Sequence, residues 1–367
     1  MGNRKTRSTQ NGDVVYFEYT KFSLVDENGG ASDLGADPGH QIIYIWDIDK
    51  TYLDTKYDTF RGLIKTAFEK AFQKVNVPGT ATLIRALSNS LGEGAHALPV
   101  YFISASPPQM ENKIHQKMLI DRLNPYGIFF KDNLKNIRPR KFKRLKQQVG
   151  FKIQSLLELS CQLKGNFKLV LFGDDSESDA VVYCLFSDIC KRRLSQTELL
   201  SILGALHVLP EQRKRILDLQ KMVPESDPVD KVYINLVADT DPDYYAKFGR
   251  RVLATFTTFQ AALDLYQDSR IDDQALVMVA KDMIANYSFT PEELAKSFDD
   301  LIKRRFLKDE FQGKILPILK EAGVLPSHFT PAFRPTRVLE KIGEKILGLD
   351  QEGPWVVENI DYLNDFR

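Results

Sequence analysis

Short, unbroken runs of apolar residues recur along the first two thirds of the chain, and most of them end on polar or acidic side chains. Runs of this kind are typical of strands that are buried on both faces of a parallel sheet. Between the runs, apolar residues return at the spacing of an amphipathic helix. This alternation predicts an α/β fold with a parallel, doubly wound sheet. The predicted strands span 42–46, 98–103, 128–130, 167–172, 231–237 and 251–256, and the predicted helices 57–75, 81–88, 110–123, 151–163 and 180–191.

The two ends of the chain depart from this pattern. Residues 1–39 are polar at first and then rich in Gly, Ala and Asp, so partial disorder is expected there, with one strand within 14–25. A helical insert is expected near 195–223, and helices dominate again after 268. We therefore predict an N-terminal segment (1–39), an α/β core (40–267) that includes the insert, and a helical C-terminal region (268–367).

Composition excludes several classes of protein. The net charge of +1 provides no overall field that would attract nucleic acid, so no nucleic-acid partner is expected. No apolar run approaches the length of a transmembrane helix, and no apolar signal core follows the N-terminus. The three cysteines and five histidines lack metal-binding spacings, which favours reduced thiols and a cytoplasmic location. The start Met1-Gly2 fits the short myristoylation pattern, which also occurs by coincidence.

One stretch, 131–146, is strongly basic, with eight lysines and arginines against a single acid, Asp132. Such runs are usually solvated loops. The alternative is a surface that attracts an anionic substrate or anionic lipid head groups, which would allow a peripheral contact with a membrane.

The most informative polar residues follow the strand at 42–46. Asp47, Asp49 and Thr51 occupy alternate positions there, and in an extended chain the two acids share a side. Open α/β sheets place their active sites at the carboxyl ends of such strands. Because neighbouring carboxylates repel each other, a cation is their natural partner.

Other chemistry-bearing residues follow the later strands in the same way. Ser104 ends the second core strand, Lys152 lies early in a helix, and Asp174 follows the strand at 167–172, with Asp175 and Asp179 close behind. Hydrolysis of a phosphate monoester on a carboxylate requires a nucleophile, a proton donor for the leaving group, a cation and phosphate-binding donors. The sequence offers each of these parts at the end of a strand or the start of a helix.

Four segments of the chain, taken in order, resemble the motifs of the haloacid dehalogenase (HAD) superfamily of phosphatases: Asp47-Ile48-Asp49-Lys50-Thr51, Ser104, Lys152, and Gly173-Asp174 with Asp179. The resemblance covers roughly residues 40–190. It implies a three-layer, Rossmann-like HAD core. It also implies a Mg²⁺-dependent phosphomonoester hydrolase that acts through an aspartyl-phosphate.

The resemblance also assigns a role to each residue. Asp47 would be the nucleophile, and Asp49 would be the general acid and then the general base. The phosphate-binding residues would be Thr51, Ser104 and Lys152. The Mg²⁺ ligands would be Asp47, Asp49, Asp174 and Asp179, with Asp175 as a further candidate.

A finer resemblance is to the actin-patch-associated and lipin-like phosphatidate phosphatases. It is carried by three segments, Tyr101–Pro107, Phe151–Ile153 with Leu156, and Leu171–Asp179 with Tyr183. Pro108 departs from it, because that group carries an aromatic residue there. The resemblance implies phosphatidate as substrate. Two alternatives stay open: a HAD phosphatase for a soluble sugar, nucleotide or protein phosphate, and a non-catalytic scaffold on the same fold.

Overall fold

The computed structural model describes residues 5–8, 14–18, 41–54, 75–89, 100–106, 108–131, 148–163, 165–176, 178–237, 240–331 and 353–363. Two features predicted from the sequence lie largely outside these residues. They are the helix at 57–75 and the basic stretch at 131–146, of which only Lys131 is described.

A single sheet runs through the described part of the molecule, with eight strands in the order β1-β2-β5-β4-β3-β6-β7-β8. From β5 to β8 all neighbours are parallel, and β1 and β2 add an antiparallel edge. The predicted parallel α/β sheet is thereby confirmed. The strands are β1 (Lys5–Ser8), β2 (Val14–Glu18), β3 (Gln41–Asp47), β4 (Val100–Ser104), β5 (Gly127–Lys131), β6 (Phe167–Asp174), β7 (Val229–Asn235) and β8 (Val252–Thr255).

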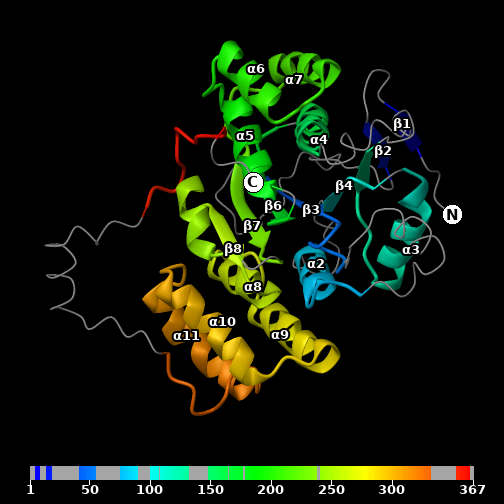
Figure 1. The fold of residues 1–367 in the computed structure, drawn as a ribbon. Helices are drawn as coiled ribbons and strands as arrows, with labels where there is room; N and C mark the ends of the chain where they lie inside the picture. The colour runs from blue at the N-terminus through cyan, green and yellow to red at the C-terminus, as the bar shows by residue number, and fades with distance from the viewer. Residues whose placement is uncertain are drawn as a thin grey trace, which may run out of the picture.

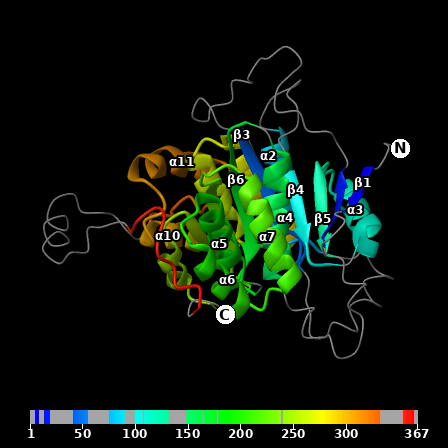
Figure 2. The same cartoon turned by 90° about the horizontal axis from the view of Figure 1, so that it is seen from above.

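Helices cover both faces of the sheet, which gives three layers (Figure 1). Four helices cover one face: α4 (Val149–Gln162), α5 (Asp179–Lys191), α6 (Gln196–Ala205) and α7 (Pro210–Met222). On the other face lie α2 (Thr80–Asn89), α3 (Glu111–Ile120), α8 (Thr258–Gln267), α9 (Asp273–Tyr287), α10 (Pro291–Lys303) and α11 (Asp309–Glu321). Figure 2 shows the molecule from above, with α4 to α7 in front of the sheet.

The continuous apolar runs arise because each strand contributes to two cores. Along β3, Ile43 and Ile45 belong to the core beneath α4 to α7, whereas Tyr44 and Trp46 belong to the opposite core. Trp46 stacks on Phe172 of β6, with ring centroids 3.7 Å apart, and the two residues are partners in the register of the strands. The alternation of side chains along a strand therefore requires apolar residues at every position.

Three segments differ from the sequence prediction. Strand β1 forms where a disordered tail was expected, because pairing with β2 satisfies its backbone although its side chains are polar. Where the sequence predicts an acidic loop at 239–243, a 3₁₀ helix, η5 (Pro242–Phe248), begins instead. A second 3₁₀ turn, η2 (Pro108–Met110), leads into α3 and agrees with the helix predicted from 110.

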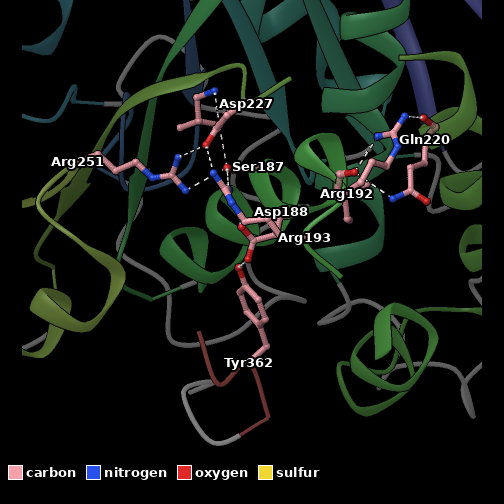
Figure 3. A network of polar contacts seen from close by, with 10 residues as sticks. Ser187, Asp188, Arg192, Arg193, Gln220, Asp227, Arg251 and Tyr362 are labelled. Atoms are coloured by element: carbon pink, nitrogen blue, oxygen red, sulfur yellow. Dashed lines mark hydrogen bonds and ion pairs between the residues drawn. The ribbon is translucent and has the colours of Figure 1, made fainter. Parts of the chain in front are cut away.

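The third difference concerns the end of the chain. The region 268–367 was predicted to be helical, and α9 to α11 do form, but residues 353–363 contain no helix. They lie against the α/β core instead: the backbone N–H of Arg251 donates to the carbonyl of Trp355 over 3.1 Å, and the Tyr362 hydroxyl donates to Asp188 of α5 over 2.5 Å (Figure 3). Within the described residues, no helix has both the length and the apolar character that crossing a bilayer requires.

Candidate active site

The predicted site residues meet at one edge of the sheet. Strand β3 ends at Asp47, β4 ends at Ser104 and β6 ends at Asp174. Because these strands are parallel neighbours, their carboxyl ends share an edge. Helix α4 supplies Lys152 and helix α5 begins at Asp179, so both helices bring a charged side chain to the same place.

Four charged side chains form a buried cluster at this edge. The Lys152 ammonium lies 3.0 Å from Asp47 Oδ1 and also bonds to Asp179 Oδ1. Asp179 Oδ2 accepts a hydrogen bond of 3.1 Å from the backbone N–H of Asp174. Oxygens of Asp47, Asp174 and Asp179 all lie within 4.8 Å of one another, and none of the four side chains belongs to a residue more than 1% exposed.

The charges in this cluster do not balance, since three carboxylates face one ammonium. Carboxylate oxygens are the ligands that hard divalent cations prefer, so the residues present fit a metal ion. The negative charge of these carboxylates also affects the pKa of the neighbouring Tyr183. Burial raises the pKa of its hydroxyl well above the usual value, the Asp179 carboxylate raises it further, and Lys152 opposes the change.

Two local features bring Asp179 into the cluster. Gly173 is needed for space, because a Cβ at this position would lie 2.3 Å from Asp179 Oδ2 and 2.5 Å from Asp179 Cβ. Ser178 has a φ of 64°, and this left-handed turn starts α5 at Asp179. The carboxylate of Asp179 therefore lies at a helix N-terminus, where negative charge is favoured.

A tight turn after β3 carries Asp49 and Thr51. The carbonyl of Ile48 accepts N–H bonds from Tyr52 at 3.1 Å and from Leu53 at 2.9 Å. Lys50 adopts a left-handed φ of 58° within this turn. The turn leaves Asp49 half-buried, beside rather than within the cluster of three acids.

Asp49 contacts a serine that was not among the predicted site residues. Asp49 Oδ2 accepts a bond of 3.4 Å from the Ser106 hydroxyl, and the Ser106 N–H donates to the hydroxyl oxygen of Ser104 over 3.1 Å. The sequence signal for Ser106 was a second serine two positions after Ser104, at the end of β4. It could not be interpreted without knowing that Asp49 lies opposite.

Thr51 lies deeper than Asp49. Its side chain is 3% exposed and lines a cavity of about 20 Å³, enough for one water molecule, together with Trp46, Phe172 and Asn235. The Asn235 side-chain amide donates to the carbonyl of Lys50 over 2.9 Å and so ties the turn to the end of β7. Asn235 is another residue that the motif pattern did not include.

Asp175 has a different environment from the other acids. Its Oδ1 accepts the backbone N–H of Val237 over 2.8 Å, so its carboxylate holds the segment after β7. It is not one of the three acids whose oxygens converge.

The fold and this edge of the sheet define a Rossmann-like α/β protein with a buried site of carboxylates and one lysine, suited to a cation and a phosphate group. Residues 42–201 match the family model of the catalytic domain of phosphatidate phosphatase APP1. The match confirms the predicted resemblance, spans every predicted site residue and points to a phosphatase. No curated protein and no solved structure gave a significant match.

Proposed function

We propose that the protein is a Mg²⁺-dependent phosphatase of the HAD type that hydrolyses phosphatidate through an aspartyl-phosphate on Asp47. The observation that carries this proposal is the contact of Asp47 with Lys152 beside two further buried acids at the sheet edge. Hydrolysis through an aspartyl-phosphate requires a carboxylate held beside an ammonium, with a second carboxyl group nearby.

The reaction would proceed in two steps. An Asp47 oxygen attacks phosphorus while the ester P–O bond breaks, and the departing alkoxide takes a proton from the Asp49 carboxyl. Water then attacks phosphorus and gives its proton to Asp49, the bond between phosphorus and Asp47 breaks, and inorganic phosphate leaves. Lys152, Ser104 and Thr51 would donate to the phosphoryl oxygens in both steps.

Asp47, Asp174 and the backbone carbonyl of Asp49 would hold the Mg²⁺. Asp179 would act through a bridging water, because its two oxygens already bond to Lys152 and to the Asp174 N–H. When bound, the ion neutralises negative charge on the carboxylates and on the phosphate. The all-carboxylate composition of the buried cluster supports Mg²⁺ over a soft metal.

Two observations support phosphatidate as the substrate. The family whose model matches residues 42–201 is described as a phosphatidate phosphatase. In addition, the basic stretch 131–146 connects the end of β5 to the start of α4, and both of these ends lie at the same sheet edge as the site. Its positive charge suits an anionic lipid surface.

The test is phosphate release from phosphatidate vesicles and from a soluble aryl phosphate, with Mg²⁺ or with EDTA. We expect Mg²⁺-dependent release, highest on the vesicles. Asp47→Asn should lose turnover by at least about 10³-fold while it keeps the fold by circular dichroism. Asp218→Asn is the matched control, since Asp218 lies half-exposed on α7 with only a 3.8 Å pair to Lys221.

Two results would separate the parts of the proposal. Wild-type turnover by Asp47→Asn would exclude the aspartyl-phosphate mechanism. Release from the soluble ester alone would retain the mechanism and exclude the lipid substrate.

A further inference from the structure

The turn that carries Asp49 and Thr51 is held by the carboxylate of a residue distant in the sequence, at the end of helix α3. Asp121 follows helix α3, and its Oδ2 accepts hydrogen bonds from the Tyr52 hydroxyl and, over 2.8 Å, from the Asn76 side-chain amide. Lys117 of α3 pairs with both oxygens at 2.5 and 2.6 Å. Asp121 therefore joins segments far apart in the sequence, and Lys117 compensates its charge.

Tyr52 is the residue through which Asp121 reaches the site. It directly follows Thr51, is fully buried, and its ring packs on Phe102 with centroids 5.5 Å apart. Burial, and after it the Asp121 carboxylate, raises the pKa of the Tyr52 hydroxyl far above its usual value. The hydroxyl therefore keeps its proton at neutral pH and donates it to the hydrogen bond with Asp121.

The backbone of Tyr52 transmits this anchoring to the turn. Its N–H donates over 3.1 Å to the carbonyl of Ile48, and Ile48 is the residue between Asp47 and Asp49. Its own carbonyl accepts the N–H of Val77 at 3.0 Å and the hydroxyl of Thr80 at 3.3 Å. Side chain and backbone together fix Tyr52, and with it the turn that presents Asp49 to Ser106.

The same set of contacts continues to the helical C-terminal region. Arg85 of α2 donates to the backbone carbonyl of Asp121 over 2.8 Å and to the Thr82 hydroxyl oxygen over 2.7 Å. Thr82 in turn donates to Asp282 of α9 over 2.7 Å. Helix α9, which supplies no predicted site residue, is thereby connected to the turn behind Asp49.

We propose that Asp121 is a positioning residue, which acts through the Tyr52 hydroxyl to hold the turn that orients Asp49. This inference rests on the proposed function, because it assigns Asp49 the transfer of a proton to the leaving group. A displaced Asp49 slows the departure of a poor leaving group more than that of a good one, since only the poor one needs the proton. Lys152 and Ser104 lie outside the turn, so we expect these two phosphate donors to keep their positions, whereas Thr51, the third donor, moves with the turn.

The experiment compares Tyr52→Phe and Asp121→Asn with Tyr362→Phe. Tyr362 is the matched control, because it is also a buried tyrosine that donates to a carboxylate, on the opposite face of the sheet. For each protein, kcat and KM are measured on phosphatidate, which has an alkyl leaving group, and on an aryl phosphate with a good leaving group. Hydrogen exchange of the amides in 48–54 is measured in parallel.

We expect Tyr52→Phe to lower kcat on phosphatidate by roughly 10- to 100-fold, with a smaller loss on the aryl ester and a smaller effect on KM than on kcat, because two of the three phosphate donors lie outside the turn. Asp121→Asn should act in the same direction, and the double variant should lose no more than the worse single variant. Exchange in 48–54 should accelerate in these variants and stay at the wild-type rate in Tyr362→Phe.

If the wild type is active, two results would overturn the proposal: an equal loss of kcat on both esters, or no change in kcat for Tyr52→Phe. An inactive wild type would count against the proposed function instead. In that case, unchanged exchange of 48–54 in Tyr52→Phe would also overturn the anchoring by Asp121, and accelerated exchange would support it.

Discussion

Helix α5 takes part in two groups of charged side chains, one fully buried and one partly buried, that differ in their ratio of cations to anions. At its start, Asp179 belongs to the site cluster, where three carboxylates face one ammonium. Towards its end, Asp188 belongs to a network in which Arg193 and Arg251 pair with Asp188 and Asp227 at 2.8 to 2.9 Å (Figure 3). Among the described residues, the second group pairs two cations with two anions, whereas the first groups three carboxylates around one ammonium, which fits the proposed binding of a metal ion there.

The balanced network lies at the other edge of the sheet. Asp227 precedes β7 and Arg251 precedes β8, so both lie at the amino ends of their strands. Ser187 joins them by donating to Asp227 over 2.8 Å while it accepts from Arg251 over 3.1 Å. The several hydrogen bonds and ion pairs among these four charged residues and Ser187 identify the network as a structural element, and its position away from the site agrees with that role.

The pKa values of the two acids in this network shift in opposite directions. Burial alone would raise the pKa of Asp227, but Arg251 and Arg193 outweigh it and hold that pKa below 3.8. For Asp188, burial prevails and raises the pKa above 3.8 despite the bonds from Tyr362 and Arg193. Paired guanidinium groups thus keep Asp227 ionised without help from any ligand.

The largest effect is expected from removing Lys152, the cation that the described residues place among the three carboxylates. Lys152→Met leaves the buried carboxylates without compensation and should lower the free energy of unfolding by about 3–5 kcal/mol in EDTA. Activity should fall by about 10²- to 10³-fold, because a phosphate donor is lost. Thermal unfolding with and without Mg²⁺ tests the charge argument: Mg²⁺ should raise the Tm of this variant more than that of the wild type. An equal shift would contradict it.

Removing one anion from the network of Arg193, Arg251, Asp188 and Asp227 gives the comparison for Lys152→Met. Asp227→Ala leaves Arg251, which is fully buried, without its carboxylate and should cost about 3 kcal/mol of unfolding free energy. Because no metal is involved, the loss should be the same in EDTA and in Mg²⁺. Urea unfolding measures it, and turnover per folded molecule should match the wild type. Rescue of this variant by Mg²⁺ would refute the distinction between the two groups.

A smaller effect is expected from Gly173→Ala. The added methyl group would meet the Asp179 side chain, so the carboxylate must shift from the position in which it bonds to the Asp174 N–H and to Lys152. Overpacking of this kind costs about 1–3 kcal/mol. Isothermal titration should also show weaker Mg²⁺ binding, since the cluster is disturbed. Gly313→Ala is the control, as a Cβ there meets nothing within 4 Å.

The smallest effect concerns pH. Since the pKa of Asp227 is lower in the folded than in the unfolded state, its ionised form stabilises the fold above pH 3.8, and this contribution disappears as the pH falls below that value. The stability difference between the wild type and Asp227→Asn should therefore be constant above a pH of about 5 and should narrow as the pH falls below about 4. Urea unfolding at several pH values measures the difference, which would stay constant if Asp227 had an ordinary pKa.

Much of the core and of the site could be predicted because the signals are local in sequence. The apolar runs identified β3, β4 and β6, and the polar residues at their ends identified Asp47, Ser104 and Asp174. Lys152 and Asp179 were predicted by their place in the motif order, and the structure brings both to Asp47. Parallel strands make this possible, because residues at successive carboxyl ends must become neighbours.

The remaining features depend on tertiary packing. Ser106 and Asn235 contact the turn after β3, yet neither lies in a pattern that distinguishes it from an ordinary polar residue. Asp121 looks like a helix-end acid until Tyr52 is placed beside it. The segment 353–363 has no periodicity to predict, because its order comes from contacts such as that of Tyr362 with Asp188.

The stacked pair of Trp46 and Phe172 gives the protein an optical property. Trp46 immediately precedes Asp47 and is 2% exposed, while the second of the two tryptophans, Trp355, is 48% exposed. Iodide should therefore quench the emission of Trp355 and leave a blue-shifted emission from Trp46. That remaining signal originates one peptide bond from the proposed nucleophile, so we expect it to report the proposed binding of metal and phosphate.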